Sequence, residues 1–182
     1  MICPTVENAV LIAVDLQSRL MPAIAGGDSV IDRAAIMVRG AAEIGLDIIV
    51  TEQYPKGLGN TVPEVSTWLP DSAKVCEKTS FSIFKNESFM TALTARKRSV
   101  LLFVGVEMGI CLLQSVLDAR NAGYEVFVVA DAVGSRNPQE CLWALDTARQ
   151  AGAVVLGSEA VLFMFLQDAK HPHFKTISGL IK

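Results

Sequence analysis

Three residues whose types suit covalent catalysis each stand at the end of a predicted strand. Asp15 closes a run of apolar residues that starts at Ala9, Lys78 follows a second run, and Cys111 comes shortly after a third. A thiol needs a proton acceptor to become a nucleophile, and a nearby cation stabilises its thiolate. Asp15 can accept the proton and Lys78 can supply the positive charge. Because the carboxyl ends of parallel strands meet at one edge of a sheet, we expect these three side chains to lie close together.

The segment Gly105–Cys111 connects the third of these runs to a predicted helix. Its two glycines permit a tight turn, and the cysteine falls in the first turn of the helix. Free backbone N–H groups and the helix dipole favour a thiolate there, and the same N–H groups can bind a developing oxyanion. On residue type alone, however, a cysteine is more often a buried core residue. Asp15 could equally cap the following turn, and Lys78 could equally be a solvated loop residue.

Other catalytic motifs are missing from the sequence. The predicted first strand–helix connection begins Leu16–Arg19 without a glycine, and Gly157 is not followed by the Lys-Ser/Thr of a phosphate loop, so nucleotide binding is poorly supported. No G-x-S-x-G segment exists for a serine hydrolase. Both histidines, His171 and His173, fall in the C-terminal tail, where we expect them in solvent rather than on a metal ion.

The composition narrows the class of protein. Of 182 residues, 51% are hydrophobic and 19% are charged, and the formal net charge is −3. This balance argues against a general nucleic-acid or membrane-surface binder, and no apolar run reaches the length of a membrane span. The N-terminal segment lacks the pattern of a secretory signal. We therefore expect a cytoplasmic protein with reduced cysteines, which are Cys3, Cys76, Cys111 and Cys141.

The chain alternates predicted strands with predicted helices. Short apolar runs predict strands buried on both faces of a parallel sheet, and they cover residues 9–15, 47–51, 73–77, 99–104, 125–130 and 153–156. Helices are predicted at 28–43, 62–69, 87–95, 110–122, 138–151 and 158–166, with a loop at 54–60 and a short tail at 168–182. Asp28 is the expected N-cap of the first helix, and Asp131 is expected to follow the fifth strand. The order predicts a single domain over residues 1–182, a three-layer α/β/α fold with a mainly parallel six-stranded sheet.

Three segments of the sequence resemble the isochorismatase-like cysteine hydrolases, a family that includes nicotinamidases, carbamoylsarcosine-type amidases and isochorismatase itself. They are Val14–Gln17 (VDLQ), Glu77–Ser82 (EKTSFS) and Gly105–Cys111 (GVEMGIC). Residues 51–59 (TEQYPKGLG) and 168–172 (DAKHP) are similar to the isochorismatase domain-containing branch of this family. The similarity runs from about residue 8 to residue 182, and it implies the Rossmann-like form of the fold that the family shares.

The resemblance implies a catalytic triad of Asp15, Lys78 and Cys111. In the family's amidases the aspartate takes the thiol proton, the cysteine attacks a carbonyl carbon, and water hydrolyses the resulting acyl-enzyme. The resemblance also implies a cis peptide bond between Val106 and Glu107. The backbone N–H groups of Glu107 and Cys111 would then form the oxyanion hole. Family members commonly form dimers or larger assemblies, so a homo-oligomer is expected.

The sequence departs from the family's patterns in ways that bear on the substrate. Thr51–Tyr54 (TEQY) stands where nicotinamidases carry a metal motif, which argues against metal dependence, and no cofactor is expected. Cys111 is present, whereas isochorismatase itself lacks this cysteine, which favours cleavage of an amide or a related acyl compound. Gln17, Gln53 and Phe81 are the candidate substrate-pocket residues, although Phe81 is equally suited to the core.

The sequence thus predicts a metal-independent cysteine hydrolase that acts on a small-molecule substrate, with no nucleic-acid or membrane partner. The alternative is a catalytically idle module of the same fold that binds a partner protein. The intact triad argues against this alternative, whereas Met108-Gly109, which alters part of the family's usual pocket wall, keeps it open. A nucleotide-binding doubly wound domain is the third interpretation, and it lacks a phosphate loop.

Overall fold

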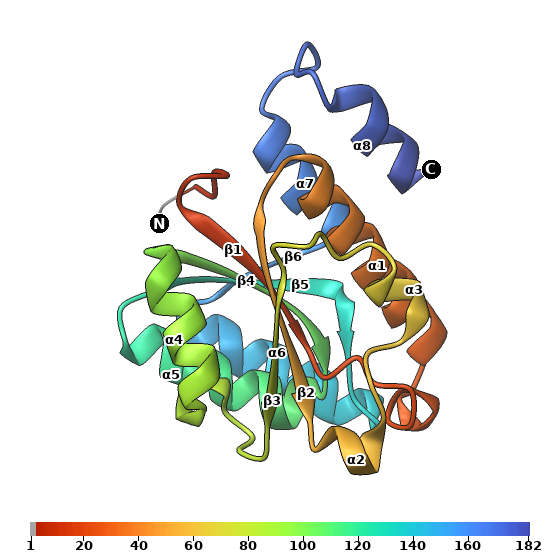
Figure 1. Ribbon diagram of the computed structural model, residues 1–182, viewed down its shortest axis with the longest axis vertical. Coiled ribbons are helices and arrows are strands. Elements are labelled where there is room, and N and C mark those ends of the chain that lie inside the picture. The colour runs from red at the N-terminus through yellow and green to blue at the C-terminus, as the bar shows by residue number, and fades with distance from the viewer. Residues whose placement is uncertain (1–2) are drawn as a thin grey trace.

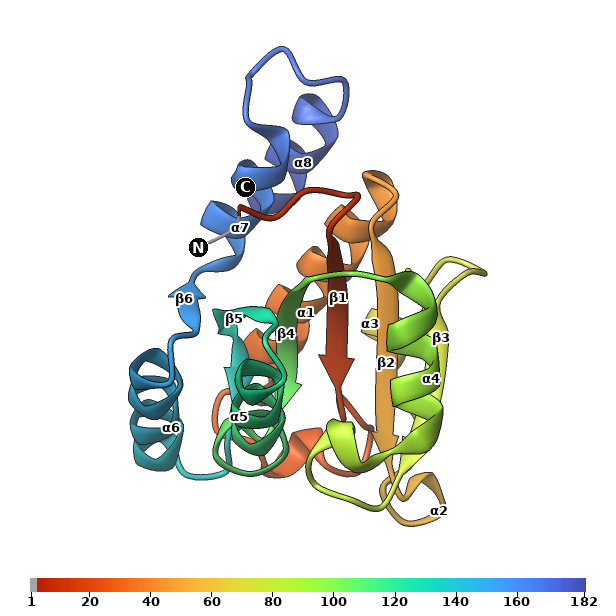
Figure 2. The same ribbon diagram turned by 90° about the vertical axis from the view of Figure 1, so that its left-hand side faces the viewer.

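The computed structural model describes residues 3–182, so Met1 and Ile2 of the N-terminal segment lie outside it. Within this range the chain builds a sheet with helices on both faces (Figures 1 and 2). The strands are β1 (Ala9–Val14), β2 (Asp47–Gln53), β3 (Lys74–Lys78), β4 (Val100–Val106), β5 (Glu125–Gly134) and β6 (Val154–Leu156). The α-helices are α1 (Gly27–Glu43), α2 (Pro55–Leu58), α3 (Pro63–Ser66), α4 (Glu87–Arg96), α5 (Leu113–Asn121), α6 (Pro138–Gln150), α7 (Ser158–Leu166) and α8 (Phe174–Ile181).

The six strands lie in the order β3-β2-β1-β4-β5-β6, and every neighbouring pair is parallel. All residues of β1 and β4 are buried, as expected for strands that helices cover on both faces. The predicted three-layer α/β/α fold is therefore confirmed, and the sheet is entirely parallel. The chain reverses its direction of strand addition between β1 and β4. In such sheets the crevice for ligands lies at the carboxyl ends of the two strands where this reversal occurs.

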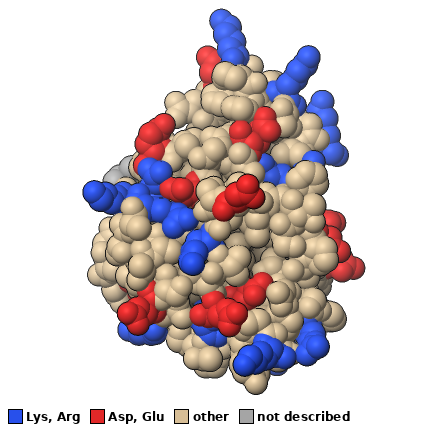
Figure 3. All heavy atoms as spheres, viewed as in Figure 1, with Lys and Arg blue, Asp and Glu red and all other residues tan. Residues whose placement is uncertain are grey.

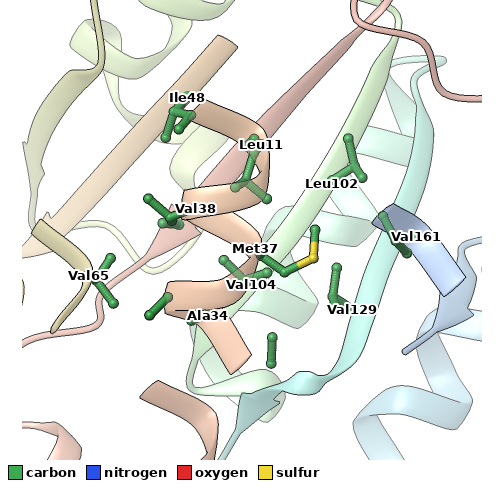
Figure 4. Close-up of a cluster of buried hydrophobic side chains, with 14 of the residues drawn as sticks. Leu11, Ala34, Met37, Val38, Ile48, Val65, Leu102, Val104, Val129 and Val161 are labelled. Carbon is green, nitrogen blue, oxygen red and sulfur yellow. The ribbon is translucent and has the colours of Figure 1, made fainter. Parts of the chain in front are cut away.

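Two hydrophobic layers hold the sheet between the helices. One layer joins the sheet to α1, α3, α7 and α8, and the other joins it to α4, α5 and α6. Figure 4 shows the first layer, in which Met37 of α1 extends toward Leu102 and Val104 of β4, and Val38 lies on the side of α1 nearer Ile48 and Val65. Burial of large aliphatic side chains contributes about 1.5–3 kcal/mol each, so the central strands are the most firmly held part of the fold. Their carboxyl ends are a rigid platform for a site.

The C-terminal segment differs from the predicted short tail. Residues 174–181 form α8, which packs against α1 and buries Ile177. His173 precedes this helix, and its Nδ1 lies 2.8 Å from Oε1 of Glu43 at the end of α1. The structure adds this helix to the predicted short tail, and the histidines there stay partly exposed. The helix was not predicted because the apolar residues of this segment are too few for a clear periodicity in isolation. Their burial depends on α1 and α7, which come from earlier in the sequence.

Strand β5 is longer than predicted, and this changes the place of Asp131. The apolar run ends at Ala130, but the strand continues to Gly134, so Asp131 lies within β5 rather than after it. Its carboxylate accepts hydrogen bonds from the backbone N–H and the hydroxyl of Ser158, both at 2.7 Å. Asp131 thereby satisfies the backbone N–H of Ser158, the first residue of α7, which is a structural use of an acid at a helix N-terminus.

Three local boundaries also differ from prediction. Helix α1 begins at Gly27, with Gly26 as N-cap at φ 65°, so Asp28 lies in the first turn instead of capping the helix. The predicted loop 54–60 contains the short helix α2, and the predicted helix 62–69 is reduced to α3. A proline opens each of these short helices, and proline is favoured at the first helical position. The loop between β2 and α3 is consequently more ordered than its Pro/Gly content suggests.

Candidate active site

The ends of β1 and β4 approach each other unusually closely at Gly105. Gly105 pairs with Val14 in the sheet and has a φ of 116°, which only glycine adopts readily. A Cβ atom there would overlap the backbone of Val14, so a larger residue would push the two strands apart. This close approach brings the residues that follow β1 and β4, Asp15 and the segment Glu107–Cys111, to one place at the sheet edge.

Asp15 is a fully buried carboxylate on a strained backbone. It follows β1 with a φ of 53°, a value that is uncommon outside glycine and that recurs at functional sites. Its side chain has no solvent exposure. Oδ1 accepts a hydrogen bond of 2.7 Å from the Thr51 hydroxyl, and Oδ2 accepts one of 2.6 Å from the Lys78 ammonium. A buried carboxylate requires such partners; Thr51 comes from the neighbouring strand β2, and Lys78 comes from β3, one strand further away.

Lys78 ends β3 and points its ammonium toward the centre of this edge. Its side chain is fully buried, which excludes a solvated loop lysine. Nζ lies 2.6 Å from Oδ2 of Asp15, 2.6 Å from Oε1 of Gln53 and 3.3 Å from the carbonyl oxygen of Ser80. It also lies 3.5 Å from Sγ of Cys111. The ammonium therefore joins the predicted base to the predicted nucleophile.

Cys111 lies in a π-helical turn, Met108–Leu112, between β4 and α5. The N–H groups of Ile110 and Leu112 both donate to the carbonyl oxygen of Glu107, which widens this turn relative to an α-helix. Insertions of this kind often occur at functional sites. The cysteine is 7% exposed, and the Lys78 ammonium that contacts its Sγ also contacts the Asp15 carboxylate. The three predicted catalytic side chains thus form one cluster.

The protonation state of Cys111 differs from the expected thiolate. Burial raises the pKa of the thiol to about 12, and the negative charge of Asp15 adds to this effect, while Lys78 opposes it. Burial also raises the pKa of Asp15 above its usual range, although Lys78 and Thr51 partly offset it. The expectation from the helix terminus was wrong because desolvation and the adjacent carboxylate outweigh the ammonium and the backbone dipoles. The raised pKa of Cys111 favours the neutral thiol over the thiolate at neutral pH.

The segment before the nucleophile is tied to the loop between β5 and α6. The peptide bond between Val106 and Glu107 is cis. The Glu107 carboxylate accepts hydrogen bonds from the backbone N–H of Arg136 at 3.0 Å and from its Nε at 3.0 and 3.1 Å. The N–H of Gly109 donates to the Ser135 hydroxyl at 3.3 Å. These contacts fix the turn that would carry the oxyanion hole. A pocket of about 470 Å³ lies beside it, lined by Glu107, Gly109, Ile110, Ser135, Arg136, Asn137 and Glu140.

The three candidate pocket residues lie in different surroundings. Gln17 is fully buried, and its amide bonds only to backbone: Nε2 donates to the carbonyl oxygens of Gln53 and Gly59, and Oε1 accepts from the N–H of Gln53. Gln53 contacts Lys78 directly, as described above. Phe81 is 54% exposed, so its interpretation as a core residue was wrong. Whether any of them contacts a substrate stays a prediction.

We expect Gln17→Leu to lower the free energy of unfolding by about 2–3 kcal/mol. The substitution fits the same space but leaves the N–H and carbonyl groups of Gln53 without their partner, and buried unpaired polar groups are costly. Urea unfolding at neutral pH measures the change. Gln139→Leu on exposed α6 is the matched control, with an expected change within about 0.5 kcal/mol. An equal effect of both substitutions would show that the Gln17 amide does not hold the β2 end.

Sequence reasoning assigned no role to two residues that complete this network. Thr51 donates to Asp15, and Arg136 holds Glu107. Thr51 pairs with Val14 across β1 and β2, so the strand register could have indicated its nearness to Asp15. Arg136 lies two residues after the end of β5. Because the sequence predicted that this strand ends at residue 130, it did not indicate that Arg136 lies at the edge of the sheet.

Metal-binding clusters and membrane-spanning helices are two features that residues 3–182 do not contain. Within residues 3–182 no group of three or more His, Cys, Asp or Glu side chains is arranged to hold a metal ion. No helix in the same range has the length and apolar character to cross a membrane.

Comparison with known proteins places this arrangement in a family. The family model described as the isochorismatase domain matches residues 9–160. The chain belongs to the isochorismatase family. Isochorismatase domain-containing protein 1 of Salmo salar is 40% identical over 176 residues, which cover 96% of this chain and 61% of that protein, so the chain spans less than two thirds of this relative.

Solved structures of the isochorismatase fold agree closely with the whole chain. The MAR1 ribonuclease of Caenorhabditis elegans has a TM-score of 0.93 and 33% identity, covering 99% of this chain and 92% of that one. The YcaC gene product of Escherichia coli, an octameric hydrolase of unknown specificity, has a TM-score of 0.89 and 25% identity, covering 100% and 95% of the two chains. The predicted family is thus confirmed, and the differing descriptions of its members leave the substrate to chemical argument.

Proposed function

We propose that the protein is a metal-independent cysteine hydrolase that cleaves a small amide or related acyl compound. One observation carries the proposal: Lys78 Nζ lies 2.6 Å from Asp15 Oδ2 and 3.5 Å from Cys111 Sγ. A nucleophile, a base and a cation are therefore in contact at the carboxyl edge of the sheet, where ligands bind in this architecture. An idle module would have no use for a fully buried Asp–Lys pair beside a thiol, since such pairs gain little stability.

The proposed reaction begins with the neutral thiol. As Cys111 Sγ attacks the carbonyl carbon, its proton passes to the Asp15 carboxylate, and a C–S bond forms. The backbone N–H groups of Glu107 and Cys111 bind the oxyanion of the tetrahedral intermediate. Collapse breaks the C–N bond, and the leaving amine takes the proton from Asp15. Water then attacks the thioester carbon, gives a proton to Asp15, and releases the acid as the proton returns to Sγ.

Lys78 keeps the net charge of the reacting groups constant through these proposed steps. In the resting cluster its positive charge offsets Asp15, and after the first proton transfer it offsets the oxyanion. The net charge of the buried groups therefore stays at zero during attack, which avoids an isolated charge in a low-dielectric site. The raised pKa of Asp15 makes this carboxylate a stronger base than an exposed aspartate.

We expect kcat/KM to rise with pH as the Asp15 carboxyl group loses its proton, and then to stay constant. The pKa of Asp15 is raised by burial, so activity should be lost as pH falls through a value above that of an ordinary aspartate. Because the pKa of Cys111 is raised to about 12, no second rise from thiolate formation should follow up to pH 9. Initial rates across this range measure both limbs. A rate that keeps increasing about tenfold per pH unit above pH 7 would contradict Asp15 as the base.

Ammonia release from a panel of primary amides tests the reaction class. Nicotinamide and N-carbamoyl amino acids are suitable first members, and EDTA should leave the rate unchanged. A fluorogenic RNA belongs in the panel because a structural neighbour is a ribonuclease. We expect no RNA cleavage, since acidic and basic side chains are interspersed on the face shown in Figure 3, and Arg96 and Arg98 are both engaged by Asp47. Cleavage of RNA with no turnover of amides would overturn the proposal.

We also propose that the protein is a cytoplasmic homo-oligomer. The E. coli relative is an octamer, and Leu142 and Trp143 of α6 each expose 56% of their surface here. Adjacent exposed aromatic and aliphatic side chains are typical of association surfaces. Light scattering at micromolar concentration would show the assembly, and a monomer would remove this part of the proposal.

A further inference from the structure

Lys78 has more acceptors around it than a catalytic ion pair requires. Its ammonium carries three N–H donors. Four acceptors lie within 3.5 Å of Nζ: Asp15, Gln53, the carbonyl of Ser80 and Cys111. The two shortest contacts, both 2.6 Å, are to the Asp15 carboxylate and to the neutral amide oxygen of Gln53. The amide thus competes with the carboxylate for the same ammonium.

The amide of Gln53 is held firmly enough to act as an anchor. Its Nε2 donates to the carbonyl oxygen of Thr79 at 2.8 Å, which directs Oε1 at the ammonium. Its backbone is fixed on both sides by Gln17, whose Oε1 accepts from the Gln53 N–H at 2.7 Å and whose Nε2 donates to the Gln53 carbonyl at 3.0 Å. Gln53 also pairs with Lys78 in the register of β2 and β3, so both side chains share one face of the sheet.

The neutral amide of Gln53 affects the Lys78 ammonium differently from a carboxylate or an apolar group at the same position. A glutamate would add a second negative charge beside the Cys111 thiol and take the ammonium away from Asp15. An apolar residue would remove one of the two short contacts of the ammonium and leave Asp15 as its only short acceptor among those described. The neutral acceptor fixes the ammonium in a shared position without changing the net charge of the buried cluster.

We propose that Gln53 is a positioning residue that holds the Lys78 ammonium between Asp15 and Cys111. This assignment rests on the proposed function, because the shared position matters only if the thiol and the carboxylate exchange a proton. It adds to that function by giving Gln53 a role through Lys78 in place of the substrate contact expected from the sequence. Gln53→Met and Gln53→Glu then disturb the cluster in opposite ways.

A pH titration of the Asp15 carboxyl carbon by ¹³C NMR tests the proposal without a substrate, with Asp15→Asn used to assign the signal. In Gln53→Met the ammonium, already 2.6 Å from Asp15, loses the amide that competes for it, so the pKa of Asp15 should fall relative to the wild-type protein. In Gln53→Glu a second carboxylate shares the ammonium, so the pKa of Asp15 should rise. Gln53→Glu should also slow the alkylation of Cys111 by iodoacetamide at pH 8 about tenfold. This factor corresponds to a rise of about one unit in the pKa of the thiol. Gln150→Glu on exposed α6 is the control and should change neither quantity.

The opposite direction of the two shifts is the result that a merely structural role would not produce. Shifts of the same sign in both variants, or titrations that coincide with the wild-type protein, would overturn the proposal. If Gln53→Met does not fold, Gln53→Glu decides, since its shape is conserved and an unchanged Asp15 pKa there contradicts the role. Opposite shifts without any amide turnover would support the positioning role and count against the proposed function instead.

Discussion

If the proposed function holds, Cys111→Ala is expected to lower hydrolysis by about 10⁴-fold or more while the protein remains folded. Removing the nucleophile of a covalent hydrolase leaves only what binding and the oxyanion hole contribute. No second thiol is placed to replace it, because the other contacts of Lys78 are oxygen atoms of Asp15, Gln53 and Ser80. The loss of one small buried side chain costs about 1–2 kcal/mol, which is within the stability of a typical domain.

Turnover of a validated amide and circular dichroism of the same sample measure both parts of this prediction. Cys141→Ala is the matched control, because Cys141 is a partly buried thiol on α6 outside the cluster. It should keep wild-type activity within about twofold, since surface-proximal changes away from a site have small effects. Residual activity of Cys111→Ala above about one tenth of wild type would contradict an acyl-enzyme intermediate on Cys111.

Lys78→Met lowers the free energy of unfolding at pH 7 by about 3–5 kcal/mol. The substitution keeps the length of the side chain but leaves the Asp15 carboxylate buried without its counter-ion. Breaking one partner of a buried pair has this cost because the remaining charge is uncompensated. Asp15→Asn in the same chain removes that charge, so the double variant should recover most of the lost stability.

Urea unfolding of the two single variants and the double variant completes the cycle. Lys85→Met is the control, because Lys85 lies 3.8 Å from Asp118 with 69% of its side chain exposed, and its loss should change stability by under about 1 kcal/mol. The effect of Lys78→Met should also shrink as pH falls, since loss of the ammonium raises the pKa of Asp15 further. An acid with a raised pKa binds its proton more tightly in the folded state, so acidification then favours folding. A double variant no more stable than Lys78→Met would contradict the buried pair.

The sheet and the identity of the central residues could be predicted because they depend on local patterns. Continuous apolar runs specify strands buried on both faces, and parallel connection places Asp15, Lys78 and Cys111 at one edge. The family resemblance strengthened this prediction by assigning the three residues a common role. The register between β1 and β2, which pairs Thr51 with Val14 next to Asp15, was not readable from either strand alone.

The features that could not be predicted depend on interactions between distant segments. The thiol state of Cys111 follows from burial and from the charge of Asp15, and a motif in the sequence reports neither quantity. Gln17 is polar and adjacent to the motif, which suggested a pocket residue, but its partners lie 36 and 42 positions further along the chain. Helix α8 is stabilised by packing on α1, so its short apolar pattern is informative only once that surface exists.

Alkylation of Cys111 by iodoacetamide at pH 8, in the wild-type protein and in Asp15→Asn, tests most directly whether Asp15 is a base acting on a neutral thiol. The Asp15 charge raises the pKa of Cys111 and Lys78 lowers it, so removal of the charge should leave a more acidic thiol. We predict that peptide mass spectrometry shows alkylation of Cys111 about tenfold faster in Asp15→Asn, while amide hydrolysis is lost. Exposed Cys3 serves as the internal reference for reagent reactivity. Slower or unchanged alkylation in Asp15→Asn would contradict the account, because the charge of Asp15 would then not be what holds the Cys111 thiol in its neutral form.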